Sequence, residues 1–487
     1  MLDKISFPYG AGFGSLTREI EAPVPLSVTG ALPVWLEGTL LRTGPSKFKV
    51  GDRSYNHWFD GLAMLHRFAF AQGCVTYANR FLKSEAFRAA ETTGRIAYAE
   101  FATDPCRTLF GRVAALFDPK LTDNGNVNVI GLGGAVAAFT ETTMPLRFDP
   151  DTLETLGVVA YAPPLSGQVS IAHPHYDAAR ACHYSYMVEF GMQSRYRLFS
   201  IGDDGAQKLV AELPVDRPAY MHSFGMTEHY LVLVEFPLVV SALDLKFSGK
   251  PFIQNYRWRP ERRLKFHVID KESGREVATA DADAAFAFHH LNAYEDGDNV
   301  VVDMITYPDA TIIDQLYLAR LRSGAALTAT GTLTRFRVPL SGDAPVSRET
   351  LAPAPLELPR IDYASHAGKP YRYVWGIGIR VPGDFLDEIV KVDVATGTVA
   401  RWYEDGMYPG EPVFVPTPSA PAEDDGVLLS VVLDITNDRS FLLVLDAATL
   451  AEILSISTVT ISRAAPVSAC RNLRWARHRG WRKRAPR

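Results

Sequence analysis

Histidines in three segments are the residues of this sequence best suited to metal chemistry. Residues 172–177 contain His173 and His175, residues 221–225 contain His222, and residues 288–293 contain His289 and His290, with gaps of about 50 and about 65 residues between the segments. Imidazole is the commonest protein ligand of transition metals. None of these histidines belongs to an HExxH pair or a Cys–His finger, so each taken alone is more typical of a structural histidine. The wide gaps are compatible with three separate structural elements delivering ligands to one point.

Short apolar or alternating runs recur along the chain and predict a protein built of β-strands. Clusters of Asp, Glu and Gly punctuate them, which is typical of a barrel, a sandwich or a propeller. The length of 487 residues favours the propeller, because about seven four-stranded blades use several hundred residues. No 40-residue repeat is visible, so the pattern leaves the number of blades open. The clearest runs are residues 230–236, 299–307, 426–433 and 440–445.

One segment, residues 105–117, predicts a helix with Asp104 as N-cap and Pro105 in its first turn. Its apolar side chains recur with a period near 3.6 residues. Such a helix either docks on the core or lies in a membrane interface. We expect a membrane contact made by Leu109, Phe110, Val113 and Phe117.

The composition is that of an ordinary globular protein, 47% hydrophobic and 22% charged. The first residues do not resemble a secretory signal, and no apolar stretch approaches the ~18 residues of a transmembrane helix. The four cysteines, Cys74, Cys106, Cys182 and Cys470, have no paired spacing. This argues against a disulfide framework and favours a reducing, cytoplasmic location.

The chain resembles the carotenoid cleavage oxygenases, most closely the branch of the animal β-carotene oxygenases and the retinoid isomerohydrolase. The resemblance runs from about residue 32 to about residue 452 and includes the three histidine segments. Many short motifs in the family's order carry it. They are residues 38–45, 57–61, 104–107, 122–124, 140–142, Tyr363, 368–371, 411–415 and 423–426.

The resemblance implies an all-β fold, a seven-bladed β-propeller with a dome of helices and loops over an iron site. In the family four histidines hold ferrous iron, and the first three correspond to His173, His222 and His289. Carboxylates that accept a hydrogen bond from ligand imidazoles fix their orientation. The positions that match these carboxylates are Glu141, Glu357 and Glu411.

The C-terminal segment departs from the family. Residues 453–487 contain no Asp or Glu, and nine Lys or Arg lie between Arg463 and Arg487. The family's fourth histidine has no counterpart, because His478 lies between two arginines. We therefore divide the chain into an oxygenase domain, residues 1–452, and an atypical basic tail, residues 453–487, without regular packing from Arg463 onward. A frameshift explains the tail best; a real basic tail for nucleic acid or anionic membrane and a natural three-histidine site are the alternatives.

The resemblance implies an enzyme, an Fe(II) dioxygenase that uses O₂ to cleave a conjugated double bond of a carotenoid or apocarotenoid to carbonyl products. An apolar, aromatic tunnel and a peripheral membrane contact are expected, and no nucleic acid. The alternatives are cleavage of a lignostilbene, isomerohydrolysis of a retinyl ester, and an inactive polyene-binding propeller. Thr140 stands where stilbene-cleaving relatives carry a Lys. Without a fourth histidine, Glu411 is expected to lack its partner.

Overall fold

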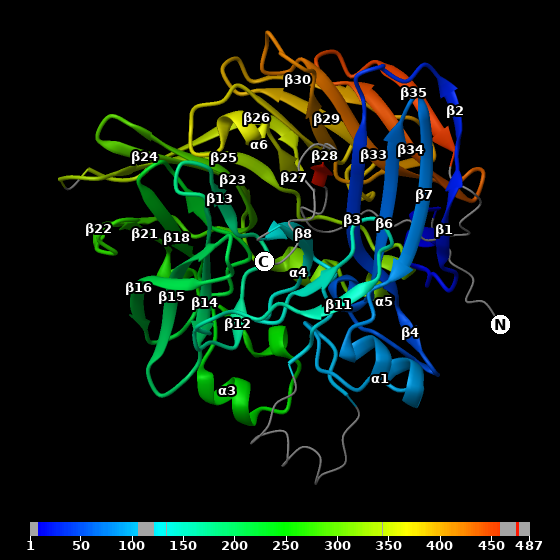
Figure 1. Cartoon of the computed structure of the whole chain (residues 1–487). Coiled ribbons are helices and arrows are strands. Elements are labelled where there is room, and N and C mark those ends of the chain that lie inside the picture. Colours follow the sequence, from blue (N-terminus) through cyan, green and yellow to red (C-terminus); the bar gives the residue numbers. More distant parts are fainter. Residues whose placement is uncertain (1–7, 106–120, 133, 343, 458–473, 477–487) are drawn as a thin grey trace, which may run out of the picture.

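Seven antiparallel sheets follow one another around the molecule as the blades of a propeller, as predicted (Figure 1). The structure is a computed structural model. It confirms the prediction that the protein is built mainly of β-strands. It describes residues 8–105, 121–132, 134–342, 344–457 and 474–476.

The first four blades use strands from the first 282 residues and one C-terminal strand. Blade I contains β1 (Ile20–Pro25), β3 (Gly38–Lys47), β6 (Leu62–Ala71), β7 (Cys74–Phe81) and β36 (Arg474–Ala476). Blade II contains β8 (Asn128–Leu132), β9 (Ala135–Phe139), β10 (Leu146–Phe148) and β11 (Thr155–Val158). Blade III contains β12 (Val169–Ser170), β13 (His175–Asp177), β14 (Cys182–Glu189), β15 (Ser194–Gly202) and β16 (Gln207–Val215). Blade IV contains β17 (Gly225–Met226), β18 (Tyr230–Glu235), β21 (Leu264–Asp270) and β22 (Glu276–Ala282).

The other three blades complete the ring. Blade V contains β23 (Phe286–Asp296), β24 (Asn299–Tyr307), β25 (Thr332–Pro339) and β26 (Ser347–Pro355). Blade VI contains β27 (Glu357–Arg360), β28 (Tyr373–Gly378), β29 (Glu388–Asp393) and β30 (Thr398–Trp402). Blade VII contains β31 (Met407–Pro409), β32 (Val413–Pro416), β33 (Gly426–Asp434), β34 (Arg439–Asp446), β35 (Glu452–Ser457) and β2 (Ser27–Gly30). Two small hairpin-like pairs, β4 (Lys49–Val50) with β5 (Arg53–Ser54) and β19 (Leu238–Val239) with β20 (Arg257–Trp258), lie outside the blades.

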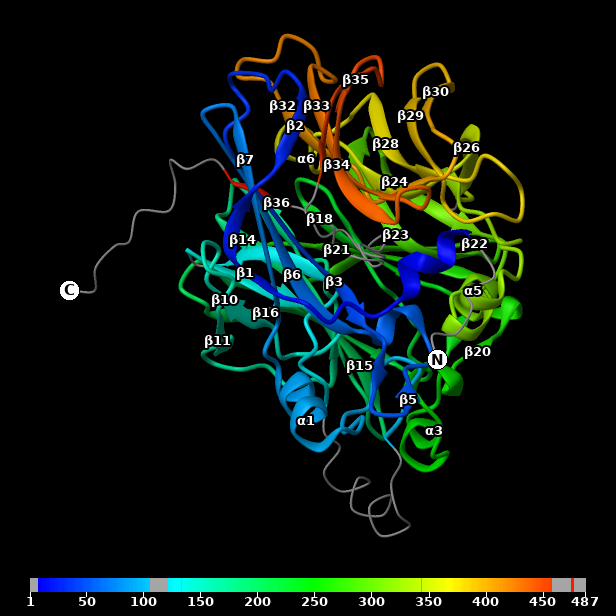
Figure 2. The same ribbon diagram turned by 90° about the vertical axis from the view of Figure 1, so that its right-hand side faces the viewer.

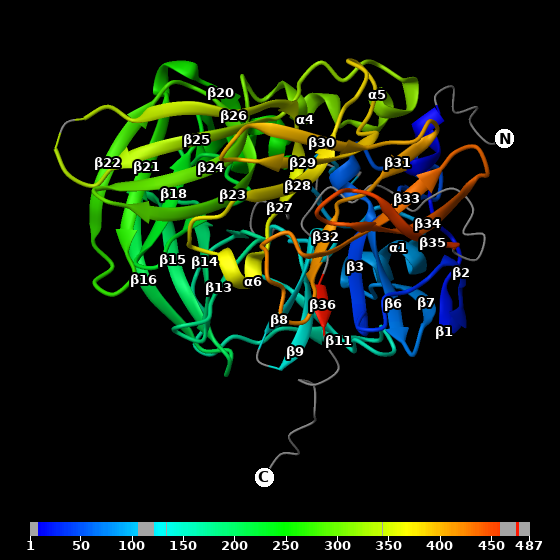
Figure 3. The ribbon, with the colours of Figure 1, turned by 90° about the horizontal axis from the view of Figure 1, so that it is seen from above.

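The ring is closed by strands from both ends of the chain. The N-terminal β2 pairs with β35 in blade VII, while β1 pairs with β7 in blade I, so consecutive strands join the last and first blades (Figure 2). At the opposite edge of blade I, β36 pairs with β3 (Figure 3). The expectation that nothing packs regularly after Arg463 is therefore wrong for residues 474–476. The sheet also continues through Ser457, beyond the proposed boundary at residue 452.

The inner strands of neighbouring blades lie close to one another, since β17 contacts β23, β23 contacts β27 and β3 contacts β8. Strands in this position are covered on both faces, which removes the usual alternation of buried and exposed side chains. Accordingly, the first nine residues of β23 are all buried. The centre of the propeller is therefore shielded from water, and polar side chains there must find partners within the protein.

The helices of the described residues are short and connect or cap the blades. They are α1 (Glu85–Thr93), α3 (Ala242–Phe247), α4 (Thr311–Gln315), α5 (Leu318–Ser323), α6 (Tyr363–His366) and the 3₁₀ turns η1 (Pro8–Phe13), η2 (Trp58–Asp60), η3 (Phe252–Asn255) and η4 (Pro260–Arg262). In the part of the chain described, no helix has the length and apolar character needed to span a membrane. The predicted membrane contacts of residues 105–117 lie outside the described residues. These are Leu109, Phe110, Val113 and Phe117.

Candidate metal centre

The structure brings the three predicted histidines together. His173 and His222 lie in the turns that lead into β13 and β17, and His289 lies within β23. They therefore come from three consecutive blades, III, IV and V. Each is at most 3% exposed, and one ring nitrogen of each lies within 4.8 Å of the other two. Among the described residues, they form a cluster that could hold a metal ion.

His222 is oriented by Glu141, the carboxylate that follows β9. Nδ1 of His222 lies 2.6 Å from Oε1 of Glu141. The hydroxyl of Tyr220 donates to the same oxygen at 3.1 Å. A carboxylate accepts the Nδ1 proton, so Nε2 of His222 keeps its lone pair for a metal.

His289 is oriented in the same way by Glu357, the first residue of β27. Its Nδ1 lies 2.6 Å from Oε2 of Glu357, whose other oxygen accepts from the hydroxyl of Tyr307 at 2.9 Å. Burial works to raise the pKa of Glu357, but the neighbouring His289 and the hydrogen bonds from Leu358 and Tyr307 hold it below its ordinary value. The carboxylate thus stays ionised inside the protein.

The residue after Glu357 has a strained backbone conformation that helps to hold the Glu357 carboxylate. Leu358 has a φ of 50°, which is unusual for a bulky residue and costs on the order of 1–3 kcal/mol. This conformation directs the Leu358 N–H onto Oε2 of Glu357 at 2.6 Å. A strained residue is retained where it fixes a functional group, and here it fixes the carboxylate that holds His289.

The third histidine completes a donor set of the right size. Nε2 of His173 lies 2.9 Å from Nε2 of His222, while its Nδ1 lies 3.3 Å from the amide nitrogen of Asn128. Two nitrogen atoms that bind one ion at right angles, each at about 2.1 Å, are about 3.0 Å apart. The observed separation therefore fits two ligands of one metal ion. Neutral imidazoles suit divalent iron as well as other transition metals.

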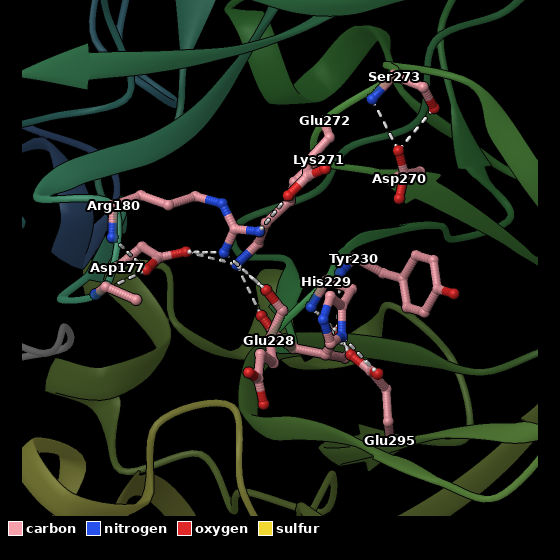
Figure 4. A network of polar contacts seen from close by, with 12 residues as sticks. Asp177, Arg180, Glu228, His229, Tyr230, Asp270, Lys271, Glu272, Ser273 and Glu295 are labelled. Atoms are coloured by element: carbon pink, nitrogen blue, oxygen red, sulfur yellow. Dashed lines mark hydrogen bonds and ion pairs between the residues drawn. The ribbon is translucent and has the colours of Figure 1, made fainter.

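A buried ion pair fixes the two strands that follow His173 and His222 (Figure 4). Nζ of Lys271 donates to Oδ2 of Asp177 in β13 at 2.8 Å and to the carbonyl of Thr227, just after β17, at 2.7 Å. Arg180 donates to the same Asp177 oxygen at 3.1 Å. Although burial alone would raise the pKa of Asp177, Lys271 and Arg180 hold it below its ordinary value. These contacts set the position of β13 relative to β17.

An apolar cavity adjoins the triad on the side of His289 and Glu357. Its empty volume, including its mouth, is about 580 Å³. Its lining is mostly apolar and rich in aromatic rings, with Thr330 and Glu357 among the polar residues. The lining includes Trp58, Phe59, Phe288, Tyr307, Leu356 and Phe385. Such a cavity is suited to bind part of a long, apolar, conjugated molecule.

Glu411, the third predicted carboxylate, has a different partner from the one expected. It is 1% exposed and lies between β31 and β32. Oε1 of Glu411 lies 2.8 Å from Nε of Arg360, and its charge also acts on the buried guanidinium of Arg42. Glu411 thus pairs with a cation, while the loss of its histidine partner stays a prediction. A buried carboxylate needs a cation or a set of donors, and Arg360 supplies the cation.

Sequence reasoning did not identify the residues that support the carboxylates. Tyr220 precedes His222 by two residues, so a period of two in an extended segment would have placed both on one face. Tyr307 ends a strand that the sequence did predict, but nothing in the pattern indicates that it reaches Glu357. The strain at Leu358 has no sequence signal.

The chain is similar to known proteins over most of its length. A profile of the family described as retinal pigment epithelial membrane protein matches residues 13–468. β,β-Carotene 15,15′-dioxygenase of Rattus norvegicus is 35% identical, with 91% of this chain and 88% of that one aligned. Carotenoid isomerooxygenase of Galleria mellonella is also 35% identical, with 95% of each chain aligned.

Solved structures show the same fold. A variant of the apocarotenoid oxygenase of Synechocystis superposes with a TM-score of 0.85 at 26% identity, over 97% of this chain and 99% of that one. The cobalt-substituted form of that enzyme superposes with a TM-score of 0.82 at 25% identity, over 96% and 98%.

Proposed function

The chain belongs to the retinal pigment epithelial membrane protein family of carotenoid oxygenases, and from this premise we propose that it is an Fe(II)-dependent dioxygenase that cleaves a conjugated double bond of a carotenoid or apocarotenoid to carbonyl products. The single observation that carries the proposal is the buried cluster of His173, His222 and His289. It stands at the wall of an apolar, aromatic cavity.

Iron is the metal we propose for the cluster. Three neutral imidazoles suit a divalent transition metal, and a site with three protein ligands leaves positions open for reactants. The relative from Synechocystis with a cobalt-substituted structure supports a divalent transition metal in this position. When bound, a ferrous ion would supply the redox chemistry that activates O₂ beside the substrate.

The chain's own residues prepare the site for that chemistry. Glu141 and Glu357 fix the orientation of His222 and His289 by accepting their Nδ1 protons. Their charges offset part of the +2 charge that three neutral ligands leave uncompensated. The rings of Phe59 and Phe288 exclude water from the side of His289 and can stabilise positive charge that develops on a polyene.

We also propose that the protein binds membranes peripherally, because carotenoids reside in bilayers. In the described residues, α3 supports this proposal. Its Leu243 and Phe247 are 69% and 64% exposed, and Asp244 and Lys246 lie between them. Exposed apolar side chains beside charged ones are typical of a segment that lies at a membrane surface. The predicted contacts of Leu109, Phe110, Val113 and Phe117 remain a second part of the same proposal.

The function is tested with purified, ferrous-loaded protein, β-carotene and an apocarotenal under ¹⁸O₂, with mass spectrometry of the products. We expect labelled aldehydes or ketones from the wild type and none from the His222→Ala variant, with iron content reduced in parallel. A stilbene product, or retinol released from a retinyl ester without O₂, would support one of the alternative activities instead. Tight polyene binding without any product would show an inactive binding protein.

A further inference from the structure

A second cavity lies between blades II and III, next to the segment that carries Glu141. Its empty volume, including its mouth, is about 810 Å³, within the range of about 300–1,000 Å³ that is common for ligand pockets. Its walls are the end of β9, the segment from 159 to 165, and one face of β14 and β15. Phe139, Met187, Phe199 and Ile201 make most of the wall apolar.

Three polar side chains in this cavity have capacity for hydrogen bonds that the described residues do not use. Ser185 is 2% exposed, and its hydroxyl has no hydrogen-bond partner among the described residues. Gln207, 6% exposed, accepts from the N–H of Leu165 through its carbonyl, whereas its amide NH₂ has no acceptor in the described part of the chain. The hydroxyl of Tyr161 likewise has no described partner, and burial raises the pKa of this phenol, so it stays protonated.

Ser185, Gln207 and Tyr161 come from three different segments and all line the same hollow. Ligand pockets typically combine a mainly apolar lining with a few polar groups that fix the orientation of the ligand. The three polar groups can therefore donate to an acceptor atom of a molecule bound in the cavity.

The chemistry of the cavity limits what it can bind. No Asp, Glu, Lys, Arg or His is among the described residues of its lining. A charged ligand would lose its hydration without gaining a counter-ion, which is costly. The occupant must therefore be neutral, mainly apolar, and equipped with an oxygen that accepts from Ser185 and Gln207.

We propose that this cavity between blades II and III binds a neutral terpenoid ring that bears a ketone or aldehyde group. The rings of Phe139 and Phe199 contact the apolar ring, and the carbonyl oxygen accepts hydrogen bonds from Ser185 and Gln207. The choice of ligand rests on the proposed function, because cleavage of a carotenoid or apocarotenoid releases such ring-bearing carbonyl fragments. The turn after β9 connects the cavity to the triad, since Thr142 lines it and the preceding residue, Glu141, holds His222.

The probe is β-ionone, a neutral ring ketone, titrated calorimetrically into metal-depleted protein. Because one hydrogen bond is worth about 1 kcal/mol, the Ser185→Ala variant should bind it about 5- to 10-fold more weakly. Ser200→Ala is the matched control: Ser200 lies on β15 between Phe199 and Ile201 and therefore faces away from the cavity. It should bind within about 2-fold of wild type. The hydrocarbon with CH₂ in place of the carbonyl should not distinguish Ser185→Ala from wild type.

A crystal structure of the complex gives the second readout, with the ketone oxygen expected near Ser185. No binding of β-ionone, equal affinity in Ser185→Ala and wild type, or a ketone found only in the cavity beside His289 would each overturn the proposal. Ketone binding is measured separately from carotenoid cleavage, so failure of this proposal can be distinguished from failure of the proposed function. A protein that binds the ketone but fails to cleave carotenoids, even when loaded with iron, would refute the dioxygenase proposal alone.

Discussion

Replacing Lys271 by Met is predicted to destabilise the propeller and to weaken metal binding together. The Lys271 side chain is 1% exposed and its ammonium group has three acceptors: Asp177, the carbonyl of Thr227 and the carbonyl of Glu228. Methionine retains much of the apolar stem but leaves all three without this donor. The Asp177 carboxylate, which is 7% exposed, then stays buried without the positive charge of Lys271.

The expected loss of stability in Lys271→Met depends on the partners that the Asp177 carboxylate keeps. Removing one partner of a buried ion pair typically costs about 3–5 kcal/mol. Asp177 keeps Arg180 at 3.1 Å and the backbone N–H of Ala179, also at 3.1 Å. We therefore expect the lower end, a loss of about 3 kcal/mol in the free energy of unfolding. The double variant with Asp177→Asn should lose less than the sum of the two single changes, because the two side chains interact directly.

Urea unfolding at pH 7 measures this loss, and a chelator competition measures metal affinity. Arg263→Met is the matched control, since it breaks an ion pair with Asp283 whose side chains are 53% and 82% exposed. Such surface pairs contribute about 0–1 kcal/mol. If Lys271→Met destabilises the protein no more than Arg263→Met does, or loses stability with unchanged metal affinity, the ion pair does not position His173 and His222 as we infer.

Three further predictions concern the site and its surroundings. Glu357→Gln and Glu141→Gln should each weaken metal binding about 10- to 100-fold without abolishing it, measured by the same competition; a carboxylate oxygen bound directly to the metal in a crystal structure would contradict this role. Replacing Leu243 and Phe247 by Ser should reduce sedimentation with anionic liposomes, while Val381→Ser, an exposed apolar residue after β28, should not; a wild type that never sediments would remove the membrane proposal. Re-reading the nucleotide sequence beyond codon 445 in all three frames should reveal a histidine-bearing segment in another frame, and its restoration should raise iron retention; an uninterrupted reading frame with full iron retention would identify the tail as genuine.

The overall fold and the position of the three histidines could be predicted because they depend on patterns that survive in one sequence. Short runs with turn residues between them predict strands, and the ordered motifs around His173, His222 and His289 indicate a common site. Glu141 and Glu357, which the resemblance placed beside the ligand imidazoles, lie within hydrogen-bond distance of His222 and His289.

The ion pairs that hold the buried carboxylates could not be predicted, because they join residues of strands that are far apart in the sequence. Arg360 reaches Glu411 from another blade, and no spacing rule connects them. The pairing of Lys271 with Asp177 joins positions 94 residues apart. The composition of the segment from Arg463 onward predicts no regular packing, yet residues 474–476 pair with β3, because backbone hydrogen bonds can form whatever the side chains are.

The most direct test of the account is an anomalous difference map recorded at the iron absorption edge from crystals of ferrous-loaded protein. The account predicts one strong peak about 2.1 Å from a ring nitrogen of each of His173, His222 and His289, with Glu141 and Glu357 outside ligand distance. A peak elsewhere, or an empty triad in a protein that still cleaves carotenoids, would contradict it.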